Sequence, residues 1–111
     1  MRLTYAIKFV GNMEEAVAVY RDKLGLEPRF ESPFWSEFAT GETVLALHPA
    51  SDENVAGSVE LGFDVGNLGT FYERRDELGI EFTRAPKEEH GAHIAQIRDG
   101  DGARISVSGT M

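Results

Sequence analysis

The chain has 111 residues, 41% of them hydrophobic, which supports a packed domain and excludes general disorder; with no cysteine, disulfides, thiol nucleophiles and zinc–thiolate sites are excluded as well. Its 19 acidic residues outnumber 11 basic ones, giving a formal net charge of −8, so neither nucleic acid nor an anionic membrane is an expected partner. The missing cysteine, and a first apolar run that is short and contains Lys8, predict a cytoplasmic protein with no signal peptide.

The first 26 residues predict a strand followed by a helix. "LTYAIKFV", residues 3–10, is short and rich in aromatic and β-branched residues, as is typical of strands. Asn12 can cap a helix, because its side-chain oxygen can accept from free amides of the first turn. Apolar residues then recur at steps of three and four and predict one buried helical stripe: Met13, Ala16, Val17, Tyr20 and Leu24. Gly25 suits the left-handed end of this helix, and three strand-like segments follow in residues 27–49.

The second half repeats this order. In "SVELGFDV", apolar residues alternate with small or polar ones, which predicts a strand with one buried face: Val59, Leu61, Phe63 and Val65. Asn67 repeats the cap and Gly79 the left-handed end. The helical stripe between them is Leu68, Phe71, Tyr72 and Leu78. Three more strand-like segments follow, and "DGDG", residues 99–102, predicts the turn between the last two.

Each half therefore has the order strand, helix, strand, strand, strand. We predict an α+β single domain over residues 1–111, with one module at 1–49, a connector at 50–57 and a second module at 58–111. Neither half is expected to bury its apolar faces alone. Pairing of the modules would place both helices on one side of a curved sheet.

The doubled order resembles the vicinal oxygen chelate superfamily, which includes glyoxalase I, bleomycin-resistance proteins and extradiol dioxygenases. The motifs that carry the resemblance are "FVGNMEEAVAVYRDKLGL", the restart "VELGFDVGNL", and "RDGDGARISV", where Gly100 replaces the usual proline. The resemblance implies an eight-stranded open, cup-shaped sheet around a ligand cavity, with the helices on its outer face. It also implies a homodimer, in which modules are exchanged between subunits in several members.

Metal-dependent members of that superfamily hold a divalent ion with four side chains, usually His or Glu, and the ion binds two neighbouring substrate oxygens. Carried over residue by residue, these ligand positions fall on Tyr5, Ala46, Glu60 and Ser106. Only Glu60 is a strong ligand, because alanine has no donor, a serine hydroxyl is neutral and a tyrosine must first lose a proton of pKa near 10. The resemblance therefore implies the cup without its usual metal site.

Strand alternation turns several polar and aromatic side chains away from the predicted core, so we expect them to line one cavity. These candidate ligand-binding residues are Tyr5, Trp35, His48, Glu60 and Ser106. Three of them also have a simpler interpretation. Glu60 would be a solvent-facing carboxylate, His48 a histidine at the rim, and Trp35 ordinary packing or a dimer contact. In "HGAH", a loop His90 followed by a strand His93 is preferred to a zinc-binding pair.

The predicted function is the binding of a small organic molecule in a metal-free cup, as in bleomycin-resistance proteins, by a cytoplasmic homodimer. The alternative is a glyoxalase- or dioxygenase-like enzyme. In one version a displaced divalent metal is held by His48 and Glu60 with His93 or a partner-chain residue, and in the other Glu60 is the catalytic base without metal. A third possibility is an assembly role without any ligand.

Overall fold

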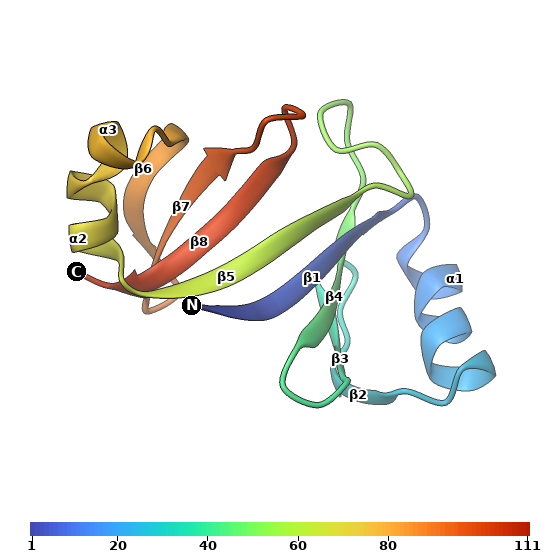
Figure 1. Cartoon of the computed structure of the whole chain (residues 1–111). Helices are drawn as coiled ribbons and strands as arrows, with labels where there is room; N and C mark the ends of the chain where they lie inside the picture. The colour runs from blue at the N-terminus through green and yellow to red at the C-terminus, as the bar shows by residue number, and fades with distance from the viewer. The chain divides into compact units, whose positions relative to one another are not determined.

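A computed structural model describes all 111 residues, and the order strand, helix, three strands occurs twice in it (Figure 1). The elements are β1 Arg2–Val10, α1 Met13–Ala18, the π-helical turn η1 Val19–Lys23, β2 Glu27–Phe30, β3 Ser36–Ala39, β4 Val44–Pro49, β5 Val59–Asn67, α2 Leu68–Glu73, α3 Arg75–Leu78, β6 Glu81–Glu89, β7 Ala92–Arg98 and β8 Arg104–Thr110. The predicted α+β class, with eight strands in two modules, is confirmed. None of the helices combines the length and the apolar character that crossing a membrane requires.

The chain divides into two compact units. The N-terminal unit is Thr4–Val59, and the C-terminal unit is Glu60–Met111 together with Met1–Leu3. In the N-terminal unit the strand order is β2-β3-β4-β1, with β1 and β4 parallel and the other pairs antiparallel. In the C-terminal unit the order is β5-β8-β7-β6, with β5 and β8 parallel and the other pairs antiparallel. Both units follow one plan, and β2 and β6 each pair on one side only, so the sheet is open, as predicted.

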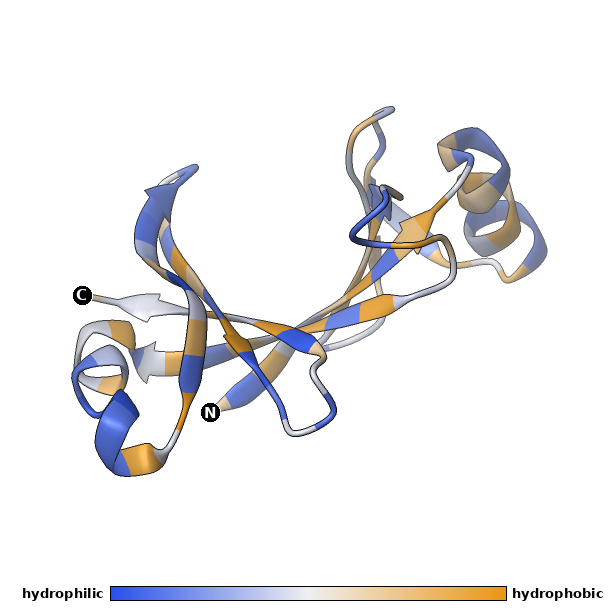
Figure 2. Cartoon of the chain, turned by 90° about the horizontal axis from the view of Figure 1, so that it is seen from above, coloured by the Kyte–Doolittle hydropathy of each residue, from blue (hydrophilic) through white to orange (hydrophobic).

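One face of the sheet in each unit packs against that unit's helix. The buried cores are Val10, Val17, Phe38 and Leu47 in the N-terminal unit, and Leu68, Ala95 and Val107 in the C-terminal unit. Along the strands apolar and polar residues alternate, and Figure 2 shows this alternation as bands of orange for hydrophobic and blue for hydrophilic residues. Because successive side chains of a strand point to opposite faces, the second face of each sheet is free to carry other chemistry.

Both predicted helix caps are present. The Oδ1 atom of Asn12 accepts a hydrogen bond from the Glu15 amide at 2.9 Å, and Asn67 does the same for the Thr70 amide at 2.9 Å. Gly79 ends the second helical segment with φ at 69°, a conformation that costs glycine little. The predicted N-terminal caps are therefore confirmed in both modules, and the predicted left-handed helix end is confirmed in the second.

The bodies of the helices depart from the predicted stripes near their ends. The first helix widens into η1, where the Leu24 amide donates to the Val19 carbonyl five residues earlier at 3.0 Å. This wider turn rotates Leu24 away from the core, and it is 63% exposed. The second helix is interrupted at Arg74, which separates α2 from α3, and Leu78 beyond the break is 41% exposed.

The predicted buried face of β5 is only partly correct. Val65, next to α2, packs against the core of the C-terminal unit. Val59 and Leu61, at the other end of the strand, are 53% and 40% exposed. The helix begins directly after the strand, so the core that it builds reaches the last residues of β5 and leaves the first ones uncovered.

The loops of the C-terminal unit match their predictions. His90 and Gly91, with φ of 50° and 82°, form the two-residue turn between β6 and β7, and His93 lies in β7. In the next loop Asp99 Oδ1 accepts from the amides of Asp101 and Ala103 at 2.9 and 3.0 Å. The Asp99 side chain of "DGDG" therefore stabilises a turn through contacts with backbone amides.

Candidate functional site

The face of the N-terminal sheet that is turned away from its core carries four aromatic rings, Tyr5, Phe9, Trp35 and His48, which we call the aromatic cluster. Register pairs Phe9 with His48 across β1 and β4, and Tyr5 lies four residues before Phe9 on the same face. The ring centroids of Tyr5 and Trp35 are 6.2 Å apart, those of Trp35 and His48 6.1 Å, and those of Phe9 and His48 5.5 Å. Three of the candidate ligand-binding residues, Tyr5, Trp35 and His48, therefore lie together.

Glu37, a residue that the sequence analysis did not select, lies within this cluster. Trp35 Nε1 donates to Glu37 Oε2 at 2.7 Å, and the Tyr5 side chain is hydrogen-bonded to the same carboxylate. Arg29 Nη1 lies 3.9 Å from Glu37 Oε1, and the Glu37 side chain is 17% exposed. The spacing in the sequence could have indicated Glu37, because it lies two residues from Trp35 and residues two apart in a strand share a face.

The environment of Tyr5 keeps its hydroxyl protonated. Burial raises the pKa of Tyr5 above its ordinary value of 10.0. The negative charge of Glu37 and its hydrogen bond raise this pKa further, whereas the positive charge of Arg29 lowers it. Tyr5 is therefore a neutral hydrogen-bonding group at physiological pH.

In the C-terminal unit, Glu60 is buried in a hydrogen-bonded chain of three side chains. Glu60 is 9% exposed and Gln96 is 7% exposed. Gln96 Nε2 lies 3.3 and 3.4 Å from the two carboxylate oxygens of Glu60, and the Thr83 hydroxyl donates to Gln96 Oε1 at 2.8 Å. A carboxylate only accepts hydrogen bonds, so the amide nitrogen faces Glu60 and the amide oxygen is left for Thr83. The simpler interpretation of Glu60 as a solvent-facing carboxylate is wrong.

Ser106 lies on the same sheet face as this chain. Its register partners are Gly62 on β5 and Gln96 on β7, and Glu60 is two residues before Gly62. Strand alternation therefore brings Glu60, Gln96 and Ser106 to one side of the sheet, opposite the core of the unit. We call Glu60, Thr83, Gln96 and Ser106 the polar face. Neither Gln96 nor Thr83 was selected from the sequence, because nothing local links them to Glu60.

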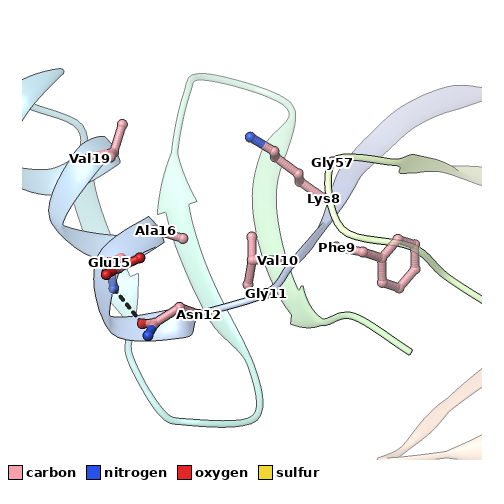
Figure 3. A pocket seen from close by; sticks show the side chains of 9 residues that line it. All are labelled: Lys8, Phe9, Val10, Gly11, Asn12, Glu15, Ala16, Val19 and Gly57. Carbon is pink, nitrogen blue, oxygen red and sulfur yellow. Dashed lines mark hydrogen bonds between the residues drawn. The ribbon is translucent and has the colours of Figure 1, made fainter. Parts of the chain in front are cut away.

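An open hollow of about 400 Å³ lies beside α1 and shares only Phe9 with the aromatic cluster (Figure 3). It is lined by Lys8, Phe9, Val10, Gly11, Asn12, Glu15, Ala16, Val19 and Gly57. Lys8 is already engaged, because its Nζ donates to the Tyr20 hydroxyl at 3.0 Å and lies 5.4 Å from the Tyr20 ring centroid. None of the candidate ligand-binding residues lines this hollow.

Comparison with known proteins agrees with the duplicated fold. A family model described as the Glyoxalase/Bleomycin resistance protein/Dioxygenase superfamily matches residues 2–107. The chain belongs to this superfamily. No curated protein matches the sequence significantly. The superfamily includes proteins of several activities, so membership leaves the chemistry to be argued from the residues.

Solved structures of this superfamily's fold match nearly the whole chain. A hypothetical protein from Bacillus halodurans matches with a TM-score of 0.82 at 13% identity, over 99% of this chain and 94% of that one. Methylmalonyl-CoA epimerase from Mycobacterium tuberculosis matches with 0.80 at 17% identity, over 98% and 87%. A glyoxalase/bleomycin resistance protein/dioxygenase superfamily member from Vibrio splendidus matches with 0.70 at 18% identity, over 99% and 98%. At these identities the similarity shows the fold alone.

The residues at the positions that the resemblance assigns to metal ligands do not fit a divalent ion. Tyr5 is a protonated phenol bound to Glu37, Ala46 is fully buried and has no donor atom, and Ser106 offers a neutral hydroxyl. Glu60 alone is a strong donor, and its oxygens face the Gln96 amide. Across all 111 residues, no three His, Asp or Glu side chains come together as ion ligands.

Proposed function

We propose that the N-terminal unit binds the planar or apolar part of a small organic molecule on its aromatic cluster without a metal ion, as expected for a bleomycin-resistance-like protein. The observation that carries this proposal is the cluster itself: Tyr5 and Trp35 are half-buried, His48 is exposed, and their rings are in contact. Ligand sites in proteins are commonly apolar surfaces with a few fixed polar groups, and Glu37 and Arg29 supply such groups here.

The cluster is held in place before any ligand arrives. The hydrogen bond from Trp35 Nε1 to Glu37 fixes the indole, and Tyr5 is hydrogen-bonded to the same carboxylate. A side chain that is already ordered loses less conformational entropy when a ligand binds. On the C-terminal unit, Glu60 and Ser106 of the polar face are the second set of proposed ligand contacts.

Trp35 is the only tryptophan, so its fluorescence reports directly on the aromatic cluster. A library of small aromatic and apolar compounds should be screened by thermal shift with a chelator present, and hits should be titrated by Trp35 fluorescence. We expect hits that raise the melting temperature by mass action and change the Trp35 emission.

A matched pair of histidine variants provides the control. His48→Asn removes a ring of the cluster and should weaken binding of the hits, whereas His90→Asn changes an exposed turn residue and should leave it unchanged. Binding that requires added nickel, zinc, iron or manganese would contradict the metal-free proposal. Hits that do not alter Trp35 emission would contradict the proposed binding site on the aromatic cluster.

The buried Glu60 favours a second candidate, an enzyme in which Glu60 removes a proton from carbon without a metal. Gln96 fixes the direction of the carboxylate, and a positioned carboxylate can act as a general base. Small carbonyl compounds should be incubated with the protein in D₂O, and exchange of their α-protons followed by NMR. We expect faster exchange with the natural chain than with Glu60→Gln, while Glu42→Gln, the same change at an exposed loop residue, keeps the exchange. Equal rates for the natural chain and Glu60→Gln would remove Glu60 as the base.

We also propose that the chain works in the cytoplasm as a homodimer. Val59 and Leu61 are large apolar residues that are 53% and 40% exposed, and a second copy could cover them. Light scattering on the purified protein should give twice the mass of one chain. The Leu61→Lys variant should shift the protein toward the monomer, and a monomeric natural chain would contradict this part of the proposal.

A further inference from the structure

The β6–β7 hairpin of the C-terminal unit contains a groove that lies outside both proposed sites. Its volume is about 230 Å³. The residues that line it are Arg84, Ala85, Lys87, Glu89, Ile94 and Ala95. The groove thus combines two cationic side chains and one carboxylate with a small apolar surface.

Irregular pairing of β6 brings the two cations to the same side of the hairpin. Arg84 is the register partner of Gln96, and Lys87 is the partner of Ile94. The register shifts on either side of Arg84, so β6 contains more residues than the part of β7 it pairs with. Such bulges redirect side chains, and Pro86 between the two cations is tolerated because β6 is an edge strand.

Arg84 and Lys87 are exposed and have no ionic partner within the chain, unlike Arg74 and Arg98 of the same unit. Arg74 is paired with Glu77 at 3.0 Å, and Arg98 with Glu81 at 3.1 Å. Two positive charges without partners in one groove favour an anion from solution. In a chain with a formal charge of −8, this attraction has to be local.

We propose that this groove binds the carboxylate of a small organic monoanion, with the hydrocarbon part of the ligand against Ala85 and Ile94. The planar guanidinium of Arg84 matches a carboxylate through two parallel hydrogen bonds, and Lys87 adds a second charge. Glu89 in the same groove leaves one net positive charge, which suits a monoanion better than a phosphate dianion. The volume is below the ~300–1,000 Å³ of pockets for drug-sized molecules, so the ligand is smaller than those.

Three probes with the same hydrocarbon chain and different charge test this proposal: butyrate, 1-butanol and butylamine. Each should be titrated into the ¹⁵N-labelled full chain while backbone amide signals are followed by NMR. We expect butyrate to shift the amides of Ala85, Lys87, Ile94 and Ala95 in a saturable way that weakens as sodium chloride is added. Butylamine should leave these signals unchanged. No saturable shift with butyrate, or equal shifts with butylamine, would overturn the proposal.

Variants with matched charge changes test the assignment to the two cations. The double variant Arg84→Gln with Lys87→Gln should bind butyrate about tenfold more weakly, because it removes the charged hydrogen-bond donors. The control Lys23→Gln with Arg74→Gln loses the same charge elsewhere and should bind as the natural chain does. Glu89→Gln should bind butyrate more tightly, because a like charge is removed. Unchanged affinity in the first double variant, or weaker binding in Glu89→Gln, would overturn the assignment.

Discussion

The two units have the same order of elements but differ in chemistry on one face of the sheet. Their helix-facing sides are alike, with buried apolar cores that contain Phe38 and Leu47 in one unit and Leu68 and Val107 in the other. On the opposite side, the N-terminal unit presents aromatic rings around Glu37. The C-terminal unit instead presents the hydrogen-bonded side chains of Glu60, Gln96 and Thr83. Its β6–β7 hairpin contains the groove lined by Arg84 and Lys87.

This difference shows which part of a duplicated fold is constrained. A strand face that packs on a helix must stay apolar to exclude water, so both copies keep that pattern. The other face contributes little to the core of its own unit, so its residues can change without loss of the fold. The faces opposite the two cores can therefore carry different chemistry in one short chain. Superfamily membership does not specify the chemistry of either face.

The largest effects are expected in the two cores. Phe38→Ala and Leu68→Ala remove side chains that are 0% exposed, and each should lower the free energy of unfolding by about 2–5 kcal/mol. Urea denaturation at neutral pH measures this loss. Phe34→Ala is the control, because Phe34 is 77% exposed and its loss should change stability by about 0.5 kcal/mol or less. If only one core variant were destabilised, the two cores would not be equivalent.

The next effect concerns the polar face. Gln96→Leu leaves the buried Glu60 carboxylate without its amide donor and should cost about 1–3 kcal/mol of unfolding free energy. The double variant Gln96→Leu with Glu60→Leu replaces both partners by apolar groups and should recover most of this loss in the same urea experiment. If Gln96→Leu alone were as stable as Ser106→Ala, the contact between Gln96 and Glu60 would contribute little to stability.

The helix caps should behave alike in the two units. Asn12→Ala and Asn67→Ala each remove the oxygen that accepts from an amide at 2.9 Å, and each should cost about 1 kcal/mol. Asn12→Asp and Asn67→Asp keep an accepting oxygen and should remain close to the natural stability. Thermal unfolding of the four variants compares the units directly, and a large cost at one cap alone would indicate unequal helices.

The smallest expected effect is a change of pKa in the aromatic cluster. The difference between ultraviolet titrations of the natural chain and Tyr5→Phe should place the pKa of Tyr5 above 10.0. Glu37→Gln should lower this pKa and Arg29→Gln should raise it, following the charge each variant removes. Because the pKa of Tyr5 is higher in the folded chain than in the unfolded chain, this group contributes to the free energy of unfolding. The contribution is fully present below pH 10.0 and is lost as the pH rises through the pKa of Tyr5 in the folded chain. A Tyr5 pKa that did not change in Glu37→Gln would contradict the contact between Tyr5 and Glu37.

The sequence alone predicted the elements, the caps and the family resemblance. Alternation along strands, steps of three and four in helices, and Asn followed by a helical stripe depend on residues close together in the chain, so they can be recognised without a structure. The same periodicity failed at Leu24 and Leu78, because a π-turn and a helix break change the direction of side chains beyond them.

Tertiary structure decided which side chains meet. Glu60 and Gln96 are 36 positions apart, and Tyr5 reaches Glu37 from another strand, so strand register alone brings these pairs together. Register also joined Arg84 and Lys87 on one side of an irregular hairpin. A one-residue slip would reverse the face of every side chain in a strand, so chemistry that depends on pairing between distant strands is fixed only when the sheet forms.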